Sequence, residues 1–325
     1  MLVLSYDEVT RLLPMDECIE VMEEALAALA RGEMYLPLRF VVRPPNAAGF
    51  MGLMPSYRGG DRPAFGLKAI NVIPDNPRLR GLDAHQGGVL LSDGQSGEPL
   101  AFLNASAITE IRTAAVSALA TRALAREDAR ELAILGAGVQ ARAHLESMAA
   151  LGRFERARIW SRTEEHARRL AEEADAPFPV AAAGSAEEAV RGADVIVTAT
   201  AAAEPVVQRE WVAEGAHINA VGACLPHVRE LDTRTVADAA FFTDRRESAE
   251  HEAGDFVLAL QEGAIGPEHI RAELGEVVAG MAAGRDGDDE ITVFESLGIA
   301  IEDLAAADHV VRRAREADVG TDVQL

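Results

Sequence analysis

One residue of this chain is set apart for acid–base chemistry, because Lys68, in the run GLKAIN, is its only lysine. Lysine and arginine together number 31, so the other 30 (31 − 1) are arginines. Arginine keeps its proton in a protein, whereas a buried lysine can lose it. The apolar neighbours Phe65, Leu67, Ala69 and Ile70 would desolvate the amine and lower its pKa. We therefore predict that Lys68 is a titratable catalytic amine; the alternative is that one lysine persists by chance in an arginine-rich chain.

A second pattern suits the binding of a dinucleotide. The run LAILGAGVQARAHL holds G-x-G-x-x-A at Gly136, Gly138 and Ala141, between an apolar strand and the start of a helix. The first glycine permits a tight turn, the second lets the backbone approach a pyrophosphate, and the alanine allows close helix packing. Val139 and Gln140 open the helix, whose free N–H groups attract an anion. The alternative is a glycine-rich turn without a ligand.

The end of the next strand predicts which dinucleotide is bound. An acidic residue there would bind the ribose 2′-hydroxyl of NAD, but this chain has Ser161, Arg162 and Thr163. A guanidinium and two hydroxyls suit a 2′-phosphate, so we predict NADP(H), with NAD(H) as the alternative if Arg162 is only a solvated charge. Further cofactor contacts are expected where later strands end, at Thr198, Thr200 and Val221.

Other chemistries lack their patterns in this sequence. The eight histidines show no metal-ligand spacing, so no metal is expected. The serine nucleophile pattern G-x-S-x-G does not occur. Cys224 follows the strand HINAVGA near the predicted ligand-binding edge of the sheet. A nucleophilic role for this thiol is the less favoured interpretation; a small buried residue is the more economical one.

The composition excludes several classes of partner. A net charge of −22 opposes binding to nucleic acids and to anionic membranes. No apolar run reaches the roughly 18 residues of a transmembrane helix. Cys18 and Cys224 are the only cysteines, which gives no disulfide framework and favours a reducing, cytoplasmic location.

These residues need two kinds of scaffold. Residues 34–102 consist of short apolar runs broken by turn residues, which predict antiparallel strands and hairpins. A helix is expected over residues 111–125. From residue 131, strands and helices alternate, which predicts an α/β fold with a Rossmann-type, doubly wound parallel sheet. A helical pattern over residues 296–316 is expected to return to the first domain.

Four stretches together resemble one known family. ITEIRTAAVSALAT, LGAGVQARAHLE, INAVGACLPHVRELD and FESLGIAIEDLAAA, in this order, are similar to the ornithine cyclodeaminase/mu-crystallin family. The resemblance implies an α+β substrate and dimerisation domain from residues 1–120 with 305–325, and a dinucleotide-binding domain from residues 121–304. It also implies a homodimer and hydride transfer between a nicotinamide and the α-carbon of a small amino or imino acid.

The resemblance also assigns roles to residues of the first domain. Arg39 and Arg112 match the arginines that hold the substrate carboxylate, and Lys68 matches the active-site lysine. Met54 matches a pocket methionine, and Thr113 matches a contact to the cofactor phosphates. The alternatives are ordinary surface pairing for the two arginines and core packing for the methionine.

One position departs from the cyclodeaminase pattern. Cys224 stands where cyclodeaminases have a catalytic aspartate that handles the substrate's amino groups, so at this position the thiol is expected to contact substrate instead. We therefore predict an NADPH-dependent reductase of the C=N bond of a small 2-imino acid, working in the cytoplasm. The alternatives are an NAD-dependent ornithine cyclodeaminase and a non-catalytic, crystallin-like NADPH store. A Lys68 Schiff base with pyridoxal phosphate is disfavoured, because the phosphate cradle belongs to a dinucleotide fold.

Overall fold

The structure is a computed structural model that describes residues 1–324, apart from the side chain of Pro77. Its contacts divide the chain into two compact units, Met1–Arg112 with Gly298–Leu325, and Thr113–Leu297. The limits expected from sequence, at residues 120 and 305, lie in helices α4 (Ala105–Leu124) and α12 (Ala300–Ala317). The division at Arg112 likewise lies within α4.

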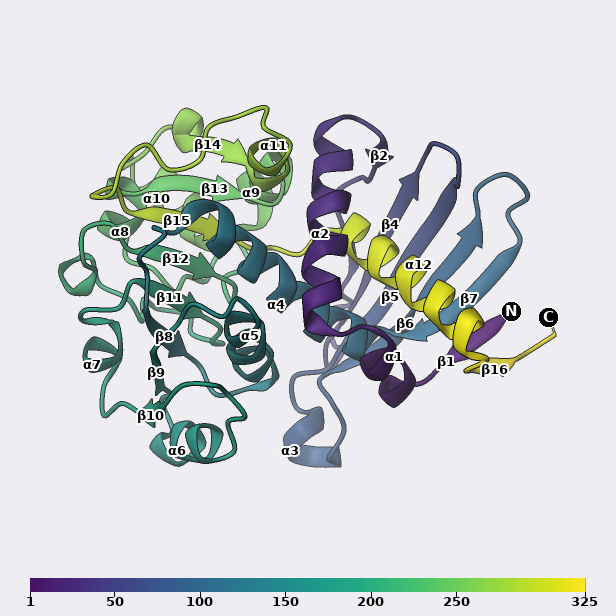
Figure 1. The fold of residues 1–325 in the computed structure, drawn as a ribbon, viewed down its shortest axis with the longest axis horizontal. Helices are drawn as coiled ribbons and strands as arrows, with labels where there is room; N and C mark the ends of the chain where they lie inside the picture. The colour runs from purple at the N-terminus through teal and green to yellow at the C-terminus, as the bar shows by residue number, and fades with distance from the viewer. Residues whose placement is uncertain (325) are drawn as a thin grey trace. The chain divides into compact units, whose positions relative to one another are not determined.

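The first unit is built on an eight-stranded sheet in the order β16-β1-β7-β6-β5-β4-β2, with β3 also paired to β4. Its long central strands β4 to β7 form an antiparallel meander (Figure 1), as the turn-rich sequence predicts. The strands are β1 (Leu2–Leu4), β2 (Met34–Tyr35), β3 (Phe40–Val42), β4 (Phe50–Arg58), β5 (Ala64–Val72), β6 (His85–Asp93), β7 (Pro99–Asn104) and β16 (Thr321–Asp322).

Helices cover one face of this sheet. They are α1 (Tyr6–Leu12), α2 (Met15–Ala30) and α12, whereas the small α3 (Asn76–Arg80) lies in the connection between β5 and β6 (Figure 1). Helices α1 and α2 are separated at Pro14, because proline has no N–H to continue the hydrogen-bond ladder. Helix α12 packs on β4, β5 and β6. Gly66 permits this close approach, since a Cβ there would lie 2.9 Å from the Leu304 Cβ.

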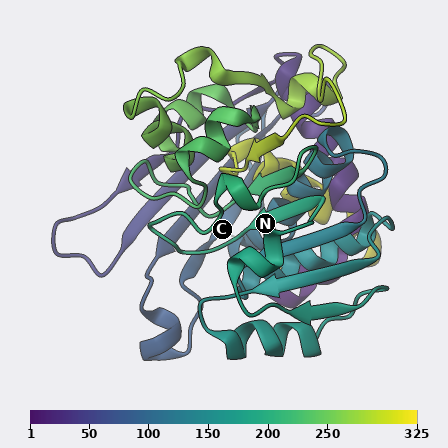
Figure 2. The same ribbon diagram turned by 90° about the vertical axis from the view of Figure 1, so that its left-hand side faces the viewer.

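The second unit contains an eight-stranded sheet in the order β10-β9-β8-β11-β12-β15-β13-β14, in which each pair of neighbours is parallel. The predicted doubly wound α/β fold is therefore confirmed. Figure 2 shows these strands as a stack of arrows from teal to green, with the yellow-green β15 among them. The strands are β8 (Glu131–Leu135), β9 (Arg156–Trp160), β10 (Val180–Ala182), β11 (Val195–Thr198), β12 (His217–Ala220), β13 (Ala240–Thr243), β14 (Ile270–Glu273) and β15 (Thr292–Glu295).

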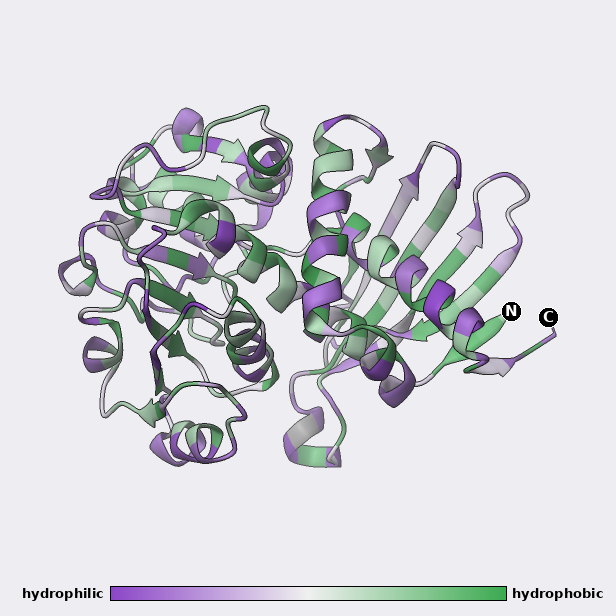
Figure 3. Ribbon diagram, in the orientation of Figure 1, coloured by the Kyte–Doolittle hydropathy of each residue, from purple (hydrophilic) through white to green (hydrophobic). Residues whose placement is uncertain are grey.

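The inner strands of the parallel sheet are buried on both faces, which explains apolar runs such as those of β8 and β11. Along β8, Leu132 and Ile134 belong to one core cluster, and Ala133 and Leu135 belong to another. Strands of this sheet are mostly green in the hydropathy view, whereas the exposed helix α6 is largely purple (Figure 3). The helices of this unit, besides part of α4, are α5 (Val139–Ala150), α6 (Glu164–Glu172), α7 (Ala186–Val190), α8 (Thr233–Asp238), α9 (Arg246–Glu252), α10 (Gly254–Gln261) and α11 (Leu274–Val278), with short 3₁₀ turns η1 (Arg209–Trp211) and η2 (Pro267–His269).

Among the helices of residues 1–324, none combines the length and the apolar character that a membrane crossing requires.

Candidate active site

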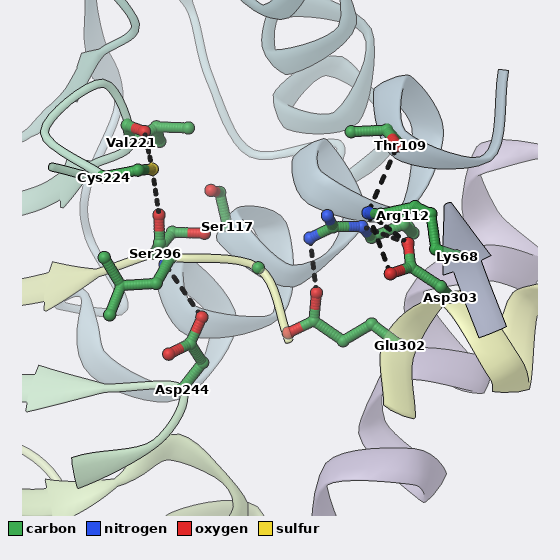
Figure 4. A network of polar contacts seen from close by, with 12 residues as sticks. Lys68, Thr109, Arg112, Ser117, Val221, Cys224, Asp244, Ser296, Glu302 and Asp303 are labelled. Atoms are coloured by element: carbon green, nitrogen blue, oxygen red, sulfur yellow. Dashed lines mark hydrogen bonds and ion pairs between the residues drawn. The ribbon is translucent and has the colours of Figure 1, made fainter. Parts of the chain in front are cut away.

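Lys68 lies on the helix-covered face of the first unit's sheet. Strand side chains alternate between faces, and in β5 the residues Ala64, Gly66 and Lys68 are buried, whereas Phe65 is exposed. Only 2% of Lys68 is exposed. Its Nζ lies 2.9 Å from Oδ1 and 2.8 Å from Oδ2 of Asp303, and 3.4 Å from the hydroxyl of Thr109 (Figure 4). A lysine buried to this degree needs such a partner, because an unpaired charge is costly inside a protein.

Arg112 belongs to the same buried network. Its Nε donates to Oδ1 of Asp303 at 3.1 Å, and one terminal nitrogen donates to Oε2 of Glu302 at 2.6 Å (Figure 4). Arg112 comes from α4, and both carboxylates come from the first turn of α12. Gly298 makes room for the guanidinium, since a Cβ there would lie 2.2 Å from an Arg112 nitrogen. Glycine also suits the φ of +70° at this position.

Arg39 reaches the same place from the loop before β3. It is half-buried, and a terminal nitrogen donates to the carbonyl oxygen of Gly298 at 3.3 Å. Arg39 and Arg112 therefore both contact Gly298, and Lys68 is close enough for both guanidiniums to lower its pKa. Met54 is buried and lies directly opposite Lys68 in the β4–β5 ladder. The family resemblance assigns substrate contact or catalysis to four residues of the first unit. The structure brings these four together: Arg39, Met54, Lys68 and Arg112.

Burial and charge act in opposite directions on Lys68. Desolvation is the main cause that lowers the pKa of the amine, and Arg112 and Arg39 lower it further. The charge of Asp303 and its hydrogen bond raise the pKa. The resulting pKa is about 8, so the amine is mostly protonated at neutral pH and can still give up its proton.

The dinucleotide pattern occupies the turn between β8 and α5. Gly136 has a φ of +125°, and a Cβ there would lie 2.4 Å from the carbonyl oxygen of Ala199. Gly138 immediately precedes α5, and a Cβ there would meet no protein atom within 4 Å. The open space beside Gly138, at the N-terminus of α5, fits a pyrophosphate. Ala141 is buried against the sheet, and Val139 and Gln140 stand in the first turn of the helix.

Ser161, Arg162 and Thr163 follow β9 at its carboxyl end. Arg162 and Thr163 are exposed and Ser161 is half-buried. Thr163 precedes α6, and its backbone N–H donates to the Ser161 hydroxyl at 3.4 Å. An exposed guanidinium at this edge is available to an anion carried by a dinucleotide.

Glu230 connects two further strand ends and was not predicted from the sequence. Its carboxylate accepts from the backbone N–H of Thr200 at 2.7 Å and from that of Gly222 at 2.7 Å, after β11 and β12. It also accepts from the Thr200 hydroxyl at 2.5 Å. Thr198 is buried at the end of β11, and Val221 is buried after β12. Burial raises the pKa of Glu230, whereas the donated hydrogen bonds oppose that rise.

Cys224 and Thr113 complete the set of predicted residues. The Cys224 thiol is half-buried and donates to the carbonyl oxygen of Val221 at 3.2 Å and more weakly to that of Ser296 at 3.8 Å (Figure 4). Thr113 is buried in α4 directly after Arg112. Both lie in the second unit, with the predicted cofactor contacts.

Sequence reasoning also missed Glu302 and Asp303. The signal was present in GIAIEDLAAA, where two adjacent acids interrupt an otherwise apolar run. Acidic residues are common in the first turn of a helix, where they favour the helix dipole, so the pair is easily read as a helix start. Both are at most 1% exposed, which shows that they serve buried cations instead.

No group of three or more histidine, cysteine, aspartate or glutamate side chains in the described chain is arranged to hold a metal ion.

Comparison with known proteins decides the family. The ornithine cyclodeaminase/mu-crystallin family matches residues 1–318. This chain belongs to that family. A Delta(1)-pyrroline-2-carboxylate reductase of Bacillus cereus is 38% identical over 328 residues, covering 100% of both chains. The ketimine reductase mu-crystallin of Mus musculus is 41% identical over 292 residues, covering 89% of each chain.

Solved structures agree with this assignment. Delta(1)-pyrroline-2-carboxylate reductase of Thermococcus litoralis, in complex with NADH and L-proline, has a TM-score of 0.96 and 38% identity, covering 99% of this chain and 100% of its own. An archaeal alanine dehydrogenase dimer with bound NAD has a TM-score of 0.94 and 35% identity, covering 100% and 99%. The predicted family, the fold and the class of enzyme, a nicotinamide-dependent oxidoreductase acting on carbon–nitrogen bonds, are confirmed.

Proposed function

We propose that this member of the family is an NADPH-dependent reductase of small cyclic 2-imino acids such as pyrroline-2-carboxylate. One observation carries the proposal: a buried, titratable lysine stands beside two guanidiniums that converge on Gly298. Such a site offers a proton donor and a carboxylate clamp together. The relatives named as pyrroline-2-carboxylate and ketimine reductases support the same chemistry.

The two arginines are proposed to hold the substrate carboxylate. Lys68 and Arg112 pair with Asp303 and Glu302, and Arg39 adds a third cation to the group. The three positive charges would attract a substrate carboxylate. Guanidiniums bind carboxylates in a fixed, often bidentate geometry, which would hold the adjacent α-carbon in one place. Such positioning is a large source of rate.

Lys68 is proposed to protonate the substrate nitrogen. Proton transfer from Nζ to an imine nitrogen makes the neighbouring carbon a stronger electrophile. General acids work best when their pKa lies near the working pH, and the pKa of Lys68 is about 8. When bound, the nicotinamide cofactor supplies the hydride that reduces this carbon. Met54, opposite Lys68 in the ladder, would provide an apolar wall for the ring.

The residues present fit a dinucleotide. Gly136 and Gly138 would receive the pyrophosphate at the start of α5, with Val139 and Gln140 in the same turn and Thr113 as a further phosphate contact. At the strand ends, Thr198, Thr200 and Val221 would contact the rest of the cofactor, and Glu230 would hold their loops in place.

We propose NADP(H) as the preferred form because Arg162 is exposed at the end of β9. Ser161 and Thr163 would add hydroxyls to a 2′-phosphate there. Two solved relatives contain NADH or NAD. NAD(H) is therefore the alternative cofactor, and the assay below distinguishes the two.

The open face of the first unit's sheet supports a homodimer. Phe65 and Leu67 point away from Lys68, and the ladder carries this face through Leu90 to Phe102. On the other side it continues to Phe40 by way of Leu53 and Ala69. Phe40 is 63% exposed, Phe65 50% and Phe102 41%. An apolar face of this kind marks an interaction site, and we propose that a second copy of the chain covers it.

The first test is oxidation of NADPH and of NADH, followed at 340 nm with pyrroline-2-carboxylate and piperideine-2-carboxylate. Turnover with a clear NADPH preference is expected. Release of ammonia and proline from ornithine, without net change in cofactor, would indicate a cyclodeaminase despite Cys224. Tight NADPH binding without turnover of any of these compounds would indicate a storage protein. A cytoplasmic location stays a prediction, which fractionation of the source cells would test.

A further inference from the structure

Asp303 is the charged group nearest to Lys68, and the proposed reaction has so far given it no part. Both of its oxygens lie within 2.9 Å of Nζ. Its Oδ1 also accepts from Nε of Arg112 at 3.1 Å. The side chain is 1% exposed, so this carboxylate is committed to the two cations beside it.

The neighbouring Glu302 is the second carboxylate of the buried group in which Asp303 pairs with Lys68 and Arg112. Glu302 accepts from a terminal nitrogen of Arg112 at 2.6 Å, on the opposite edge of the guanidinium from Nε. Arg112 therefore pairs with both carboxylates, whereas the ion pair of Lys68 is with Asp303. Gly66 allows α12 to pack closely on β5, and this close packing brings Asp303 to the Lys68 amine.

We propose that Asp303 is a positioning residue that keeps the proton on Lys68 until substrate arrives and fixes the direction in which the amine donates it. The inference rests on the proposed function and deepens it. Without a nearby carboxylate, a buried amine between two guanidiniums would be driven to its neutral form. A neutral lysine could not act as the acid that imine reduction needs.

The charges around Lys68 support this division of roles. Arg112 on α4 and Arg39 before β3 lower the pKa of the amine, whereas Asp303 raises it. His85 on β6 also lies within electrostatic range of Lys68, and its own pKa is lowered by burial and by the lysine's charge. A neutral His85 adds no charge at neutral pH. Asp303 is therefore the group whose removal should change the protonation of Lys68 most.

Oδ1 of Asp303 accepts from both Lys68 and Arg112, which is consistent with loss of the proton from Lys68. When an N–H bond breaks at Nζ and a new one forms at the substrate nitrogen, Lys68 becomes neutral and Asp303 remains negative. Nε of Arg112, 3.1 Å from Oδ1, still pairs with that carboxylate. The network thus keeps the buried aspartate compensated on both sides of the proton transfer.

The single lysine permits a direct test. Protein labelled with [ε-¹³C]lysine gives one side-chain NMR signal, and its pH titration reports the pKa of Lys68 without substrate or cofactor. In Asp303→Asn, which preserves volume and an acceptor, we expect this pKa to fall by about one unit or more. Glu302→Gln is the matched control, because it removes a nearby charge that does not contact Nζ, and a smaller shift is expected.

Asp303→Glu provides the second variant. It retains the charge at a shifted position, so its Lys68 pKa should lie between those of the wild type and Asp303→Asn. It also carries the test if Asp303→Asn does not fold. A wild-type pKa in the folded Asp303 variants would overturn the proposal.

Activity separates this inference from the proposed function. In the reductive direction kcat/KM should fall as pH rises through the Lys68 pKa, and Asp303→Asn should move that fall to lower pH. Absence of imine reduction by the wild type would refute the proposed function, while the NMR titration would still decide whether Asp303 sets the charge of Lys68.

Discussion

At the scale of single residues, the chain uses arginine for fixed positive charge and has a single lysine, whose proton can be removed. This one lysine of the chain, Lys68, is the proposed proton donor. Its surroundings tune it: burial lowers the pKa and Asp303 restores part of the loss, which leaves a value of about 8. The proposed chemistry therefore depends on a few buried contacts in the first unit.

The lysine itself gives the first prediction at this scale. Lys68→Arg should fold but lose imine reduction by about a hundredfold or more in kcat/KM, because arginine cannot donate its proton and general acid catalysis is worth roughly that factor. Steady-state kinetics and thermal unfolding would measure both effects. Activity close to that of the wild type in a folded Lys68→Arg protein would remove Lys68 from the mechanism.

Arg162 gives the second prediction. Arg162→Ala should weaken NADPH binding by roughly tenfold or more, because a charge-assisted hydrogen bond to a phosphate contributes about 1.5–3 kcal/mol. Binding of NADH should change little. Fluorescence titration with each cofactor measures the two affinities. Arg191→Ala is the control, since Arg191 is an exposed arginine whose partner Glu187 lies on α7. Equal losses for both cofactors would contradict a 2′-phosphate contact.

At the scale of elements, the carboxyl edge of the parallel sheet carries an unusual number of buried acids. Glu230, Asp244, Asp255 and Glu295 are each at most 1% exposed. Oδ1 of Asp255 accepts from the backbone N–H groups of Glu230 and Leu231 at 2.9 and 2.8 Å, which fixes the segment that carries Glu230. Through these contacts Glu230 and Asp255 hold the loops beside the proposed cofactor contacts.

Asp255 gives the prediction for this edge. Burial raises its pKa to about 8, with Glu230 adding to the rise. The folded state thus retains a proton that the unfolded state loses near pH 4, so the free energy of unfolding falls as pH rises from about 4 to about 8. Asp255→Asn keeps a neutral side chain there and should be more stable than the wild type at pH 7, by about 1–3 kcal/mol.

Urea unfolding at several pH values between 5 and 8 would measure this difference. The gap between Asp255→Asn and the wild type should widen as the pH rises. Asp75→Asn serves as the control, because Asp75 is an exposed partner of Arg78 and should leave the pH dependence unchanged. A variant that is less stable than the wild type at every pH would show that the ionised carboxylate is required.

At the scale of the whole molecule, the open face of the first unit's sheet is the feature that calls for another chain. The chain carries a net charge of −22, yet Phe40, Phe65 and Phe102 are exposed together on one sheet face. The archaeal alanine dehydrogenase with bound NAD is a dimer, which supports the proposal that a second copy of this chain is the partner.

The corresponding prediction concerns assembly. Replacing both Phe65 and Phe102 by aspartate should convert a dimer into monomers, because two buried charges without partners would oppose association. Sedimentation velocity at micromolar concentration would show the change in mass. Met281→Asp is the control, since Met281 is 61% exposed in the second unit. Persistence of the wild-type mass in the double variant would place the interface elsewhere.

The sequence by itself determined the family, the doubly wound sheet and the lone lysine as the candidate acid. These depend on local signals: the strand, glycine turn and helix around Gly136, the apolar runs of buried strands, and one amine among guanidiniums. Local order along the chain carries them, so they need no knowledge of distant contacts.

Tertiary structure alone decided which acids serve the lysine. Asp303 lies 235 residues from Lys68 along the chain, and only the packing of α12 on β5 brings them within 2.9 Å. The same holds for Glu230 at the edge of the second sheet, and for β15, which inserts between β12 and β13 although it follows both in sequence. Pairing between distant segments leaves no periodic pattern, because either partner by itself reads as an ordinary acid or a short apolar run.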